Sequence, residues 1–215
     1  CKNKWGGFFL DYITILEYIG VFAFAVSGAI VAIEEEFDVF GIYIIAIITA
    51  MGGGVLRDIV TNVGIPVFFT SYMTIPFIIA GTLFAILLKG RLKHKNLFVF
   101  IDAIGLAAFF VSAAVKAIGS NYNYMLFIFA ASITGVGGGV LRDIITNRKP
   151  QIFKHDIYCV AGVIGVTLLW FIYPLIGVDV AQFIALIAIV IIRMVSYYKT
   201  INLPVVCRKS EFLES

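Results

Sequence analysis

Two identical seven-residue stretches hold the residue types in this sequence that could do chemistry. Three glycines are followed by Val-Leu and then by an arginine and an aspartate, at residues 52–58 and again at residues 137–143, which is 85 positions later (137 − 52 = 85). Glycine-rich turns can cradle phosphate groups. Both stretches lie inside strongly apolar segments, however, and no carboxylate pair follows that would hold magnesium. We therefore interpret them as parts of a membrane protein and not as a nucleotide site.

The composition places the chain in a membrane. Of its 215 residues, 61% are hydrophobic and 13% are charged, whereas soluble domains average about 45–50% and about 25%. The formal net charge of +3 is too small to indicate a nucleic-acid partner. The sequence shows no Ser/His/Asp, Cys/His or metal-ligating constellation, so we expect no catalytic residues, no metal site, no cofactor and no enzymatic activity.

Apolar segments of about 20 residues, without the alternation of a β-barrel, predict transmembrane helices. We count seven and expect an all-α integral membrane protein. The sixth is expected to end near Tyr173-Pro174, because proline limits a helix. The expected helices cover residues 12–33, 39–62, 72–88, 97–118, 123–146, 156–173 and 180–200.

The offset of 85 positions extends far beyond the glycines. Counting residues 17–68 against residues 102–153 without a gap gives 23 identical positions of 52. Each copy contains three expected helices, and an odd number turns the second copy over in the membrane. The pattern thus predicts a 3+3 inverted repeat plus a seventh helix, with a substrate or ion path near the bilayer midplane between the copies. The expected units are residues 12–95, residues 96–174 and, for the seventh helix and tail, residues 175–205.

The distribution of Lys and Arg predicts the orientation of the chain, for which we expect the cell inner (plasma) membrane. Most of these residues fall in the loop at 89–95, the loop at 148–154 and the tail after residue 198. We expect this side to be cytoplasmic, with the N-terminus outside, the C-terminus cytoplasmic and the acidic loop 34–38 also cytoplasmic. The basic loop 89–95 is in addition a candidate contact for anionic lipids.

The repeated glycines have two interpretations. They can let two helices approach closely, as small residues do throughout membrane bundles. They can also bend or break the second and fifth helices and expose backbone groups to a water-filled path. We favour the second interpretation, a bend or break, because matched glycine triplets at inverted positions indicate a shared central feature. The residues concerned are Gly52, Gly53, Gly54, Gly137, Gly138 and Gly139.

The charged residues after the glycines need partners or water, because a charge at membrane depth costs at least about 2.5–3.5 kcal/mol. Neighbours on a helix point about 100° apart, which disfavours pairing of Arg57 with Asp58. We expect Arg57 to pair with Asp143, and Arg142 with Asp58, across the repeat. These pairs would either lock the two copies together or line the path and gate it.

Two carboxylates occupy matching places near the entry of the first and fourth helices, Glu17 and Asp102. They are candidates for the mouth of the path, where they would attract cations, or for solvated acids at the interface. Lys116 stands where the other copy has Val31, and we expect its ammonium group to extend to the membrane interface.

These features resemble a known family. Residues 24–29 (Phe-Ala-Val-Ser-Gly-Ala), the doubled motif and the 3+3+1 helix plan look like the prokaryotic members of the trimeric intracellular cation channel family, over roughly residues 12–200. The resemblance implies a homotrimer with a pore in each protomer between the repeats. It further implies that kinked second and fifth helices line the pore, that Arg57 and Arg142 are candidates for its narrow part, and that it passes mainly K+ with some Na+.

The resemblance leaves two functions open, because other bacterial relatives with the doubled motif are described as glycine transporters. Our first hypothesis is a monovalent-cation channel, in which K+ or Na+ is the permeant ion. The alternative is a secondary transporter of a small zwitterion such as glycine, with the two repeats rocking around the substrate.

Overall fold

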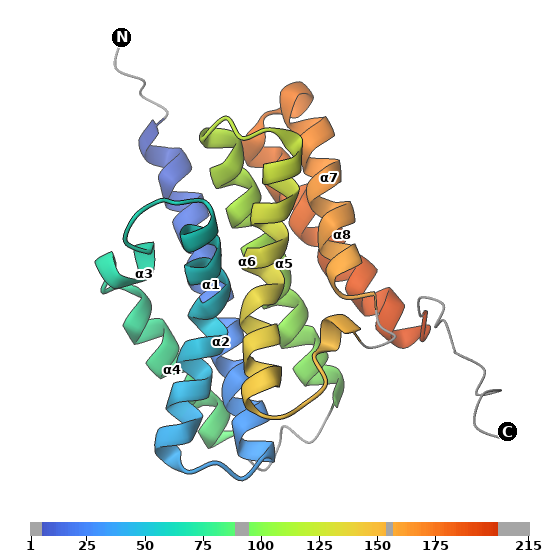
Figure 1. The fold of residues 1–215 in the computed structure, drawn as a ribbon. Coiled ribbons are helices and arrows are strands. Elements are labelled where there is room, and N and C mark those ends of the chain that lie inside the picture. The colour runs from blue at the N-terminus through green and yellow to red at the C-terminus, as the bar shows by residue number, and fades with distance from the viewer. Residues whose placement is uncertain (1–5, 89–94, 154–156, 202–215) are drawn as a thin grey trace, which may run out of the picture.

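The computed structural model describes residues 6–88, 95–153 and 157–201, which form a bundle of α-helices (Figure 1). Among these residues, six helices are long and apolar enough to cross a membrane, by length and composition, and α4 is a shorter apolar helix. The expected all-α membrane protein is therefore confirmed, and two short elements, α3 and η1, were not expected. The elements are α1 (Gly6–Glu34), α2 (Val39–Val60), α3 (Val67–Thr70), α4 (Thr74–Leu87), α5 (Lys95–Gly119), α6 (Tyr124–Ile145), the 3-10 helix η1 (Gln151–Phe153), α7 (Cys159–Ile176) and α8 (Val178–Tyr198).

The second helix of each copy begins and ends with the same local signals. Asp38 before α2 and Asn123 before α6 each accept a hydrogen bond from the backbone amide three residues later, at 2.7 and 2.9 Å, which is the usual N-cap. After these helices, Asn62 and Asn147 adopt the left-handed conformation with φ of 55° and 56°. The amide of the following residue then returns to a carbonyl five positions earlier, and the helix ends. The duplication therefore includes the turns as well as the helices.

Equivalent helices of the two copies pack against each other in opposite directions. In α1 and α5, Gly20 lies against the ring of Phe109, and Gly105 lies against the ring of Phe24. The two rings meet edge to face with their centroids 5.1 Å apart. Because residue numbers rise along one helix while they fall along the other, α1 and α5 are antiparallel (Figure 1). This is the packing that an inverted duplication requires.

The repeated glycines form a close crossing of α2 and α6. A Cβ atom on Gly53 would overlap the carbonyl oxygen of Thr134, and one on Gly138 would overlap the carbonyl oxygen of Thr49. Both helices continue through their glycines without interruption. A break of either helix is therefore wrong, whereas a bend at the glycines stays a prediction. The structure shows a close approach of the two helices, which small residues permit.

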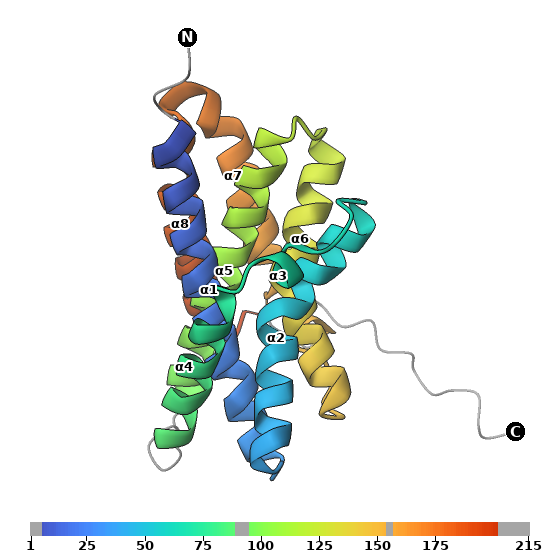
Figure 2. The same ribbon diagram turned by 90° about the vertical axis from the view of Figure 1, so that its left-hand side faces the viewer.

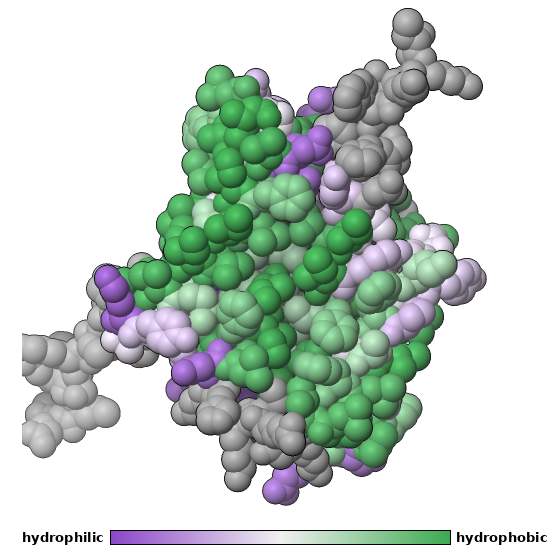
Figure 3. All heavy atoms as spheres, turned by 180° about the vertical axis from the view of Figure 1, so that it is seen from behind, coloured by the Kyte–Doolittle hydropathy of each residue, from purple (hydrophilic) through white to green (hydrophobic). Residues whose placement is uncertain are grey.

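The remaining helices stand on either side of this centre (Figures 1 and 2). Helix α4 packs against α1 and α2, whereas α7 packs against α5, α6 and α8, and α8 also contacts α5. Figure 3 shows the molecule from the side opposite to Figure 1, and apolar side chains cover most of that face. A surface of this kind suits the hydrocarbon region of a bilayer.

Helix α7 continues past the point where the proline was expected to end it. Pro174 lies in the last turn of α7, and the helix ends at Gly177, whose φ is 83°. A proline forfeits one backbone hydrogen bond, which the last turn of a helix tolerates, but a glycine in the left-handed region turns the chain away. The stop signal is therefore Gly177.

Two connecting loops meet at one end of the bundle. The Nη1 and Nε atoms of Arg148, after α6, lie 2.9 and 2.5 Å from carboxylate oxygens of Glu34, the last residue of α1, and Glu35, the residue after it. The acidic loop 34–38 and the loop after α6 thus lie at the same end of the bundle. The basic loop 89–95, apart from the backbone of Lys95, lies outside the described residues, and so does the chain after residue 201.

Candidate functional site

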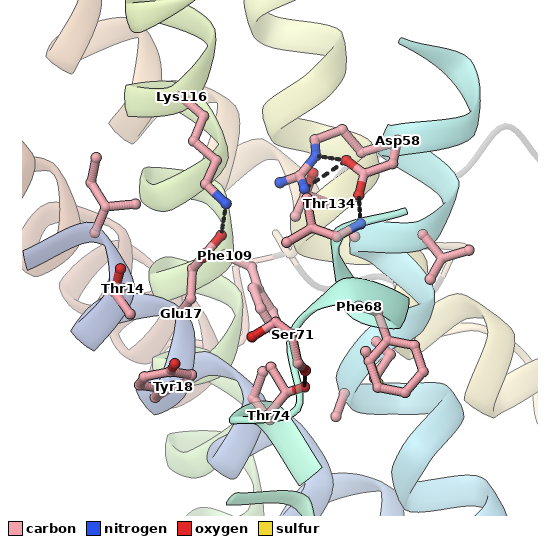
Figure 4. A pocket seen from close by; sticks show the side chains of 18 residues that line it. Thr14, Glu17, Tyr18, Asp58, Phe68, Ser71, Thr74, Phe109, Lys116 and Thr134 are labelled. Atoms are coloured by element: carbon pink, nitrogen blue, oxygen red, sulfur yellow. Dashed lines mark hydrogen bonds and ion pairs between the residues drawn. The ribbon is translucent and has the colours of Figure 1, made fainter. Parts of the chain in front are cut away.

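A cavity of ≈ 340 Å³ lies in the first half of the molecule (Figure 4). An ion pair between Glu17 and Lys116 lines one side, and an ion pair between Arg57 and Asp58 lines the other. The cavity reaches the crossing of α2 and α6, because Gly54 and Thr134 are among its lining residues. Its other polar lining residues are Thr14, Tyr18, Ser71 and Thr74.

The guanidinium group of Arg57 pairs with its neighbour in sequence. Its Nε and Nη2 atoms lie 2.8 and 2.7 Å from Oδ1 of Asp58. The expected pairing of Arg57 with Asp143 is therefore wrong. The Cβ directions of adjacent residues diverge on a helix, but the long arginine side chain bends back to the neighbouring carboxylate.

The aspartates of the two motifs also fix the segments that follow them. The second carboxylate oxygen of Asp58 accepts a hydrogen bond from the amide of Val67, and that of Asp143 accepts one from the amide of Gln151, both at 3.0 Å. The two contacts differ by one position because the counterpart of Gln151 is Pro66 (151 − 85 = 66), and proline has no N–H group. Each aspartate thus holds both its arginine and the short helix after the motif.

Arg142 is completely buried and has a larger set of partners. Its Nε atom lies 2.8 Å from Oδ1 of Asp143, and its Nη1 atom donates to Ser27 Oγ at 2.5 Å and to Asp102 Oδ1 at 3.1 Å. Ser27 also donates to Asp102, at 2.8 Å. The expected pairing with Asp58 is wrong. Asp102 is 1% exposed, so it is a buried partner of Arg142 and not a carboxylate at a mouth.

Two more buried residues, Tyr158 and Arg193, belong to this cluster. The guanidinium carbon of Arg193 lies 5.0 Å from the centroid of the Tyr158 ring, and Tyr158 interacts electrostatically with Asp102, Arg142 and Arg193. The two arginines and the two aspartates of the cluster sum to no net charge, which reduces the penalty of burying them. A lone arginine in the apolar segment 180–200 was the sequence signal for Arg193, whereas nothing in the sequence distinguished Tyr158.

The cluster is not fully satisfied. Within the described part of the chain, Asp102 Oδ2, Arg142 Nη2 and Tyr158 Oη are buried and have no hydrogen-bond partner. A Cβ atom on Gly139 would lie 3.4 Å from Tyr158 Oη and 3.8 Å from Arg142 Nη2. An unsatisfied buried polar group costs about 1–3 kcal/mol. The second half is therefore sealed around Gly139, but additional hydrogen-bond partners for these three atoms would stabilise it.

The first half is open at the equivalent place. Gly54, the counterpart of Gly139 (54 + 85 = 139), lines the cavity, and a Cβ atom built on it would meet nothing within 4 Å. Glu17, the counterpart of Asp102, contacts Lys116 in place of an arginine. The ammonium group of Lys116 binds this carboxylate, and the expected extension of Lys116 to the membrane interface stays a prediction. The structure thus holds two related copies, with identical seven-residue motifs, in two different arrangements.

The fold and the site define a multi-pass helical membrane protein, made of two antiparallel, related halves, with a cavity lined by two ion pairs in the first half. A family model described as glycine transporter matches the chain twice, over residues 14–89 and 99–174. These segments begin and end 85 positions apart (99 − 14 = 85; 174 − 89 = 85). The chain therefore belongs to this family, as the doubled motif predicted.

Relatives and solved structures agree with this assignment. The chain is 38% identical over 196 residues to the UPF0126 membrane protein YvgT of Bacillus subtilis, across 88% of this chain and 94% of that protein. It superposes on a solved TRIC cation channel with a TM-score of 0.79 and 30% identity, across 92% of this chain and 98% of that one. It also superposes on a prokaryotic TRIC channel crystallised in 0.5 M KCl, with a TM-score of 0.83 and 26% identity, across 90% and 100%.

Proposed function

We propose that the chain is a monovalent-cation channel that passes K+ and Na+ along a path between its two halves. The observation that carries the proposal is the cavity of the first half, which is lined by two ion pairs and extends from Glu17 to the crossing of α2 and α6. The similarity of nearly the whole chain to solved TRIC cation channels supports the same function.

The lining of the cavity suits a cation path with a gate. The Glu17 carboxylate attracts cations to the entrance, and hydroxyl groups such as those of Ser71 and Thr134 replace water around the ion. Arg57 repels cations and therefore acts as a charge that regulates flow, not as a binding site. Beyond the crossing, the Arg142 cluster blocks the path, so we interpret this arrangement as non-conducting.

The assembly and the topology belong to the proposal as well. Six spans cross the membrane with ordinary lengths, and α4 is the seventh, although its 14 residues cover only about 21 Å at 1.5 Å per residue. We place the N-terminus outside and the C-terminus in the cytoplasm of a cell inner membrane, and the repeats at residues 12–95 and 96–174. Each pore lies within one protomer of a homotrimer, the assembly that the family resemblance implies.

One observation favours a second function, the transport of a small zwitterion such as glycine. The cavity presents a cation and a carboxylate on each of two sides, Arg57 with Asp58 and Lys116 with Glu17. A zwitterion carries the complementary pair of charges. The family description, glycine transporter, supports this alternative.

Recordings from purified protein in planar bilayers distinguish the two functions. We expect unitary K+ current steps, and a severalfold larger unitary conductance for Arg57→Ala, because the substitution removes a positive charge from the path. Arg148→Ala is the matched control, since its ion pairs are exposed at the end of the bundle and such pairs contribute about 0–1 kcal/mol. Saturable glycine uptake into liposomes without current steps would contradict the channel and establish the transporter.

A further inference from the structure

We propose that Lys116 keeps the cavity of the first half open, because it holds the Glu17 carboxylate away from Arg57. The inference deepens the proposed function, since it concerns the gating of the same cavity, and it rests on that function for its meaning in permeation. Its structural content, an exchange of partners at one carboxylate, is independent of what passes through the cavity.

In the sealed second half, Arg142 makes contacts around Gly139 that Arg57, among the described residues, does not make around Gly54 in the open first half. In the sealed half, Arg142 reaches both Asp102, at 3.1 Å, and Ser27, at 2.5 Å. These contacts draw α6, α5 and α1 together over Gly139. The same three elements of the inverted copy are α2, α1 and α5, which surround the cavity at Gly54.

The counterparts of the three sealing residues are present but are engaged elsewhere. Arg57 pairs with Asp58, and Glu17 pairs with Lys116. Ser112, the counterpart of Ser27, donates to the carbonyl oxygen of Phe109 at 3.3 Å. The counterparts of Arg142, Asp102 and Ser27 are therefore all present in the first half, and the described contact that engages the Glu17 carboxylate is the one with Lys116.

Lys116 is also a position at which the two copies differ in charge. Its counterpart, Val31 (116 − 85 = 31), is apolar and 1% exposed, so the corresponding position offers Asp102 no second cation. Glu17, the counterpart of Asp102, is one methylene longer than the aspartate. The charged groups that line the cavity are Glu17, Arg57, Asp58 and Lys116, so Lys116 and Arg57 are the two cations that compete for Glu17.

The first half therefore has two states, open and sealed, and the partner of the Glu17 carboxylate decides between them. While Lys116 holds Glu17, the cavity around Gly54 stays open. When Glu17 turns to Arg57, the first half adopts the sealed arrangement now seen in the second half. A protein with these two states closes its first half when Lys116 releases Glu17 to Arg57.

A cysteine at Gly54 reports the state of the cavity. This position has space for a side chain, and Cys1, Cys159 and Cys207 are first replaced by alanine so that Gly54→Cys carries the only thiol. The rate of labelling by a membrane-impermeant, positively charged thiol reagent is then measured on the full chain in detergent. The readout needs no ion flux, so its failure and a failure of the proposed function are distinguishable.

We expect Lys116→Val, which installs the residue of the other copy, to slow labelling at least about tenfold. Lys116→Arg retains a cation and should label as fast as the parent. Lys116→Val combined with Glu17→Gln should also label as fast as the parent, because the amide cannot form the new ion pair with Arg57. This double variant separates an exchange of partners from a general disturbance of the fold.

Two results would overturn the proposal. One is a folded Lys116→Val protein, with the gel-filtration profile of the parent, that labels at the parent rate. The other is slow labelling of Lys116→Val that persists when Glu17 is replaced by glutamine, because the effect would then not require the carboxylate.

Discussion

Arg142→Met should lower the stability of the folded protein by about 3–5 kcal/mol, the usual loss when one partner of a buried ion pair is removed. The substitution leaves the Asp102 and Asp143 carboxylates buried, at 1% and 3% exposure, without the guanidinium group that contacts both. It also removes the partner of Ser27. Thermal unfolding of the purified protein in a mild detergent measures the effect as a large drop in Tm.

Arg57→Met is the matched control, because the two arginines occupy equivalent positions 85 residues apart. Arg57 has one carboxylate partner, Asp58, and an 11% exposed side chain that lines the cavity. Water therefore compensates Asp58 in part, and the loss should be clearly smaller. Combining Arg142→Met with Asp102→Asn should recover part of the stability, since one buried charge disappears with its partner. Equal losses for the two arginine variants would contradict the difference between an open and a sealed half.

Gly138→Ala should also destabilise the protein strongly, by about 1–3 kcal/mol or more. The added methyl group would overlap the carbonyl oxygen of Thr49, and a backbone atom cannot move aside as a flexible side chain does. Helices α2 and α6 must therefore separate, which loosens the central contact of the bundle. The same unfolding experiment in detergent gives the Tm, and gel filtration shows whether the elution profile of the parent is kept.

Gly54→Ala serves as the control for the glycine prediction. It belongs to the same repeated triplets, but its added methyl group would enter open space. Because alanine favours a helix over glycine by about 1 kcal/mol, the Tm should stay the same or rise. A Gly138→Ala protein as stable as Gly54→Ala would show that the crossing is looser than the structure indicates.

Most of the fold could be predicted because the sequence contains two copies of the same helical unit. The offset of 85 residues located both copies, and the odd number of helices in each copy predicted that α1 and α5 run antiparallel, as the reciprocal contacts of Gly20 and Gly105 show. The short elements α3 and η1 escaped prediction because they depend on tertiary hydrogen bonds. Asp58 and Asp143 accept these hydrogen bonds from backbone amides beyond the helix ends. Such contacts leave no periodic pattern in the sequence.

The partners of the charged residues could not be predicted from spacing. Cβ directions on a helix disfavour Arg57 with Asp58, but an arginine has enough rotatable bonds to reverse that preference. The glycines were ambiguous for a related reason, since the same residue permits a break and a close crossing. Packing of α2 against α6 decides between them, and packing is not visible in one chain's sequence.

In the sequence, the difference between the halves is visible only as substitutions between the two copies. Lys116 in place of Val31 was noticed, but its meaning depends on Glu17, which lies on another helix. Tyr158, beside Gly139 in the sealed half, corresponds to Met73 (158 − 85 = 73), and Met73 is 66% exposed. Sequence identity between the motifs therefore concealed two different environments.

If cations pass through the cavity of the first half, blocking that cavity should stop the current. K+ currents are recorded in a planar bilayer from the Gly54→Cys protein that lacks the three native cysteines, before and after addition of a positively charged thiol reagent. We predict that the current falls in step with labelling, while the cysteine-free parent is unaffected. Complete labelling of the cysteine, verified by mass spectrometry, with an unchanged K+ current would contradict it.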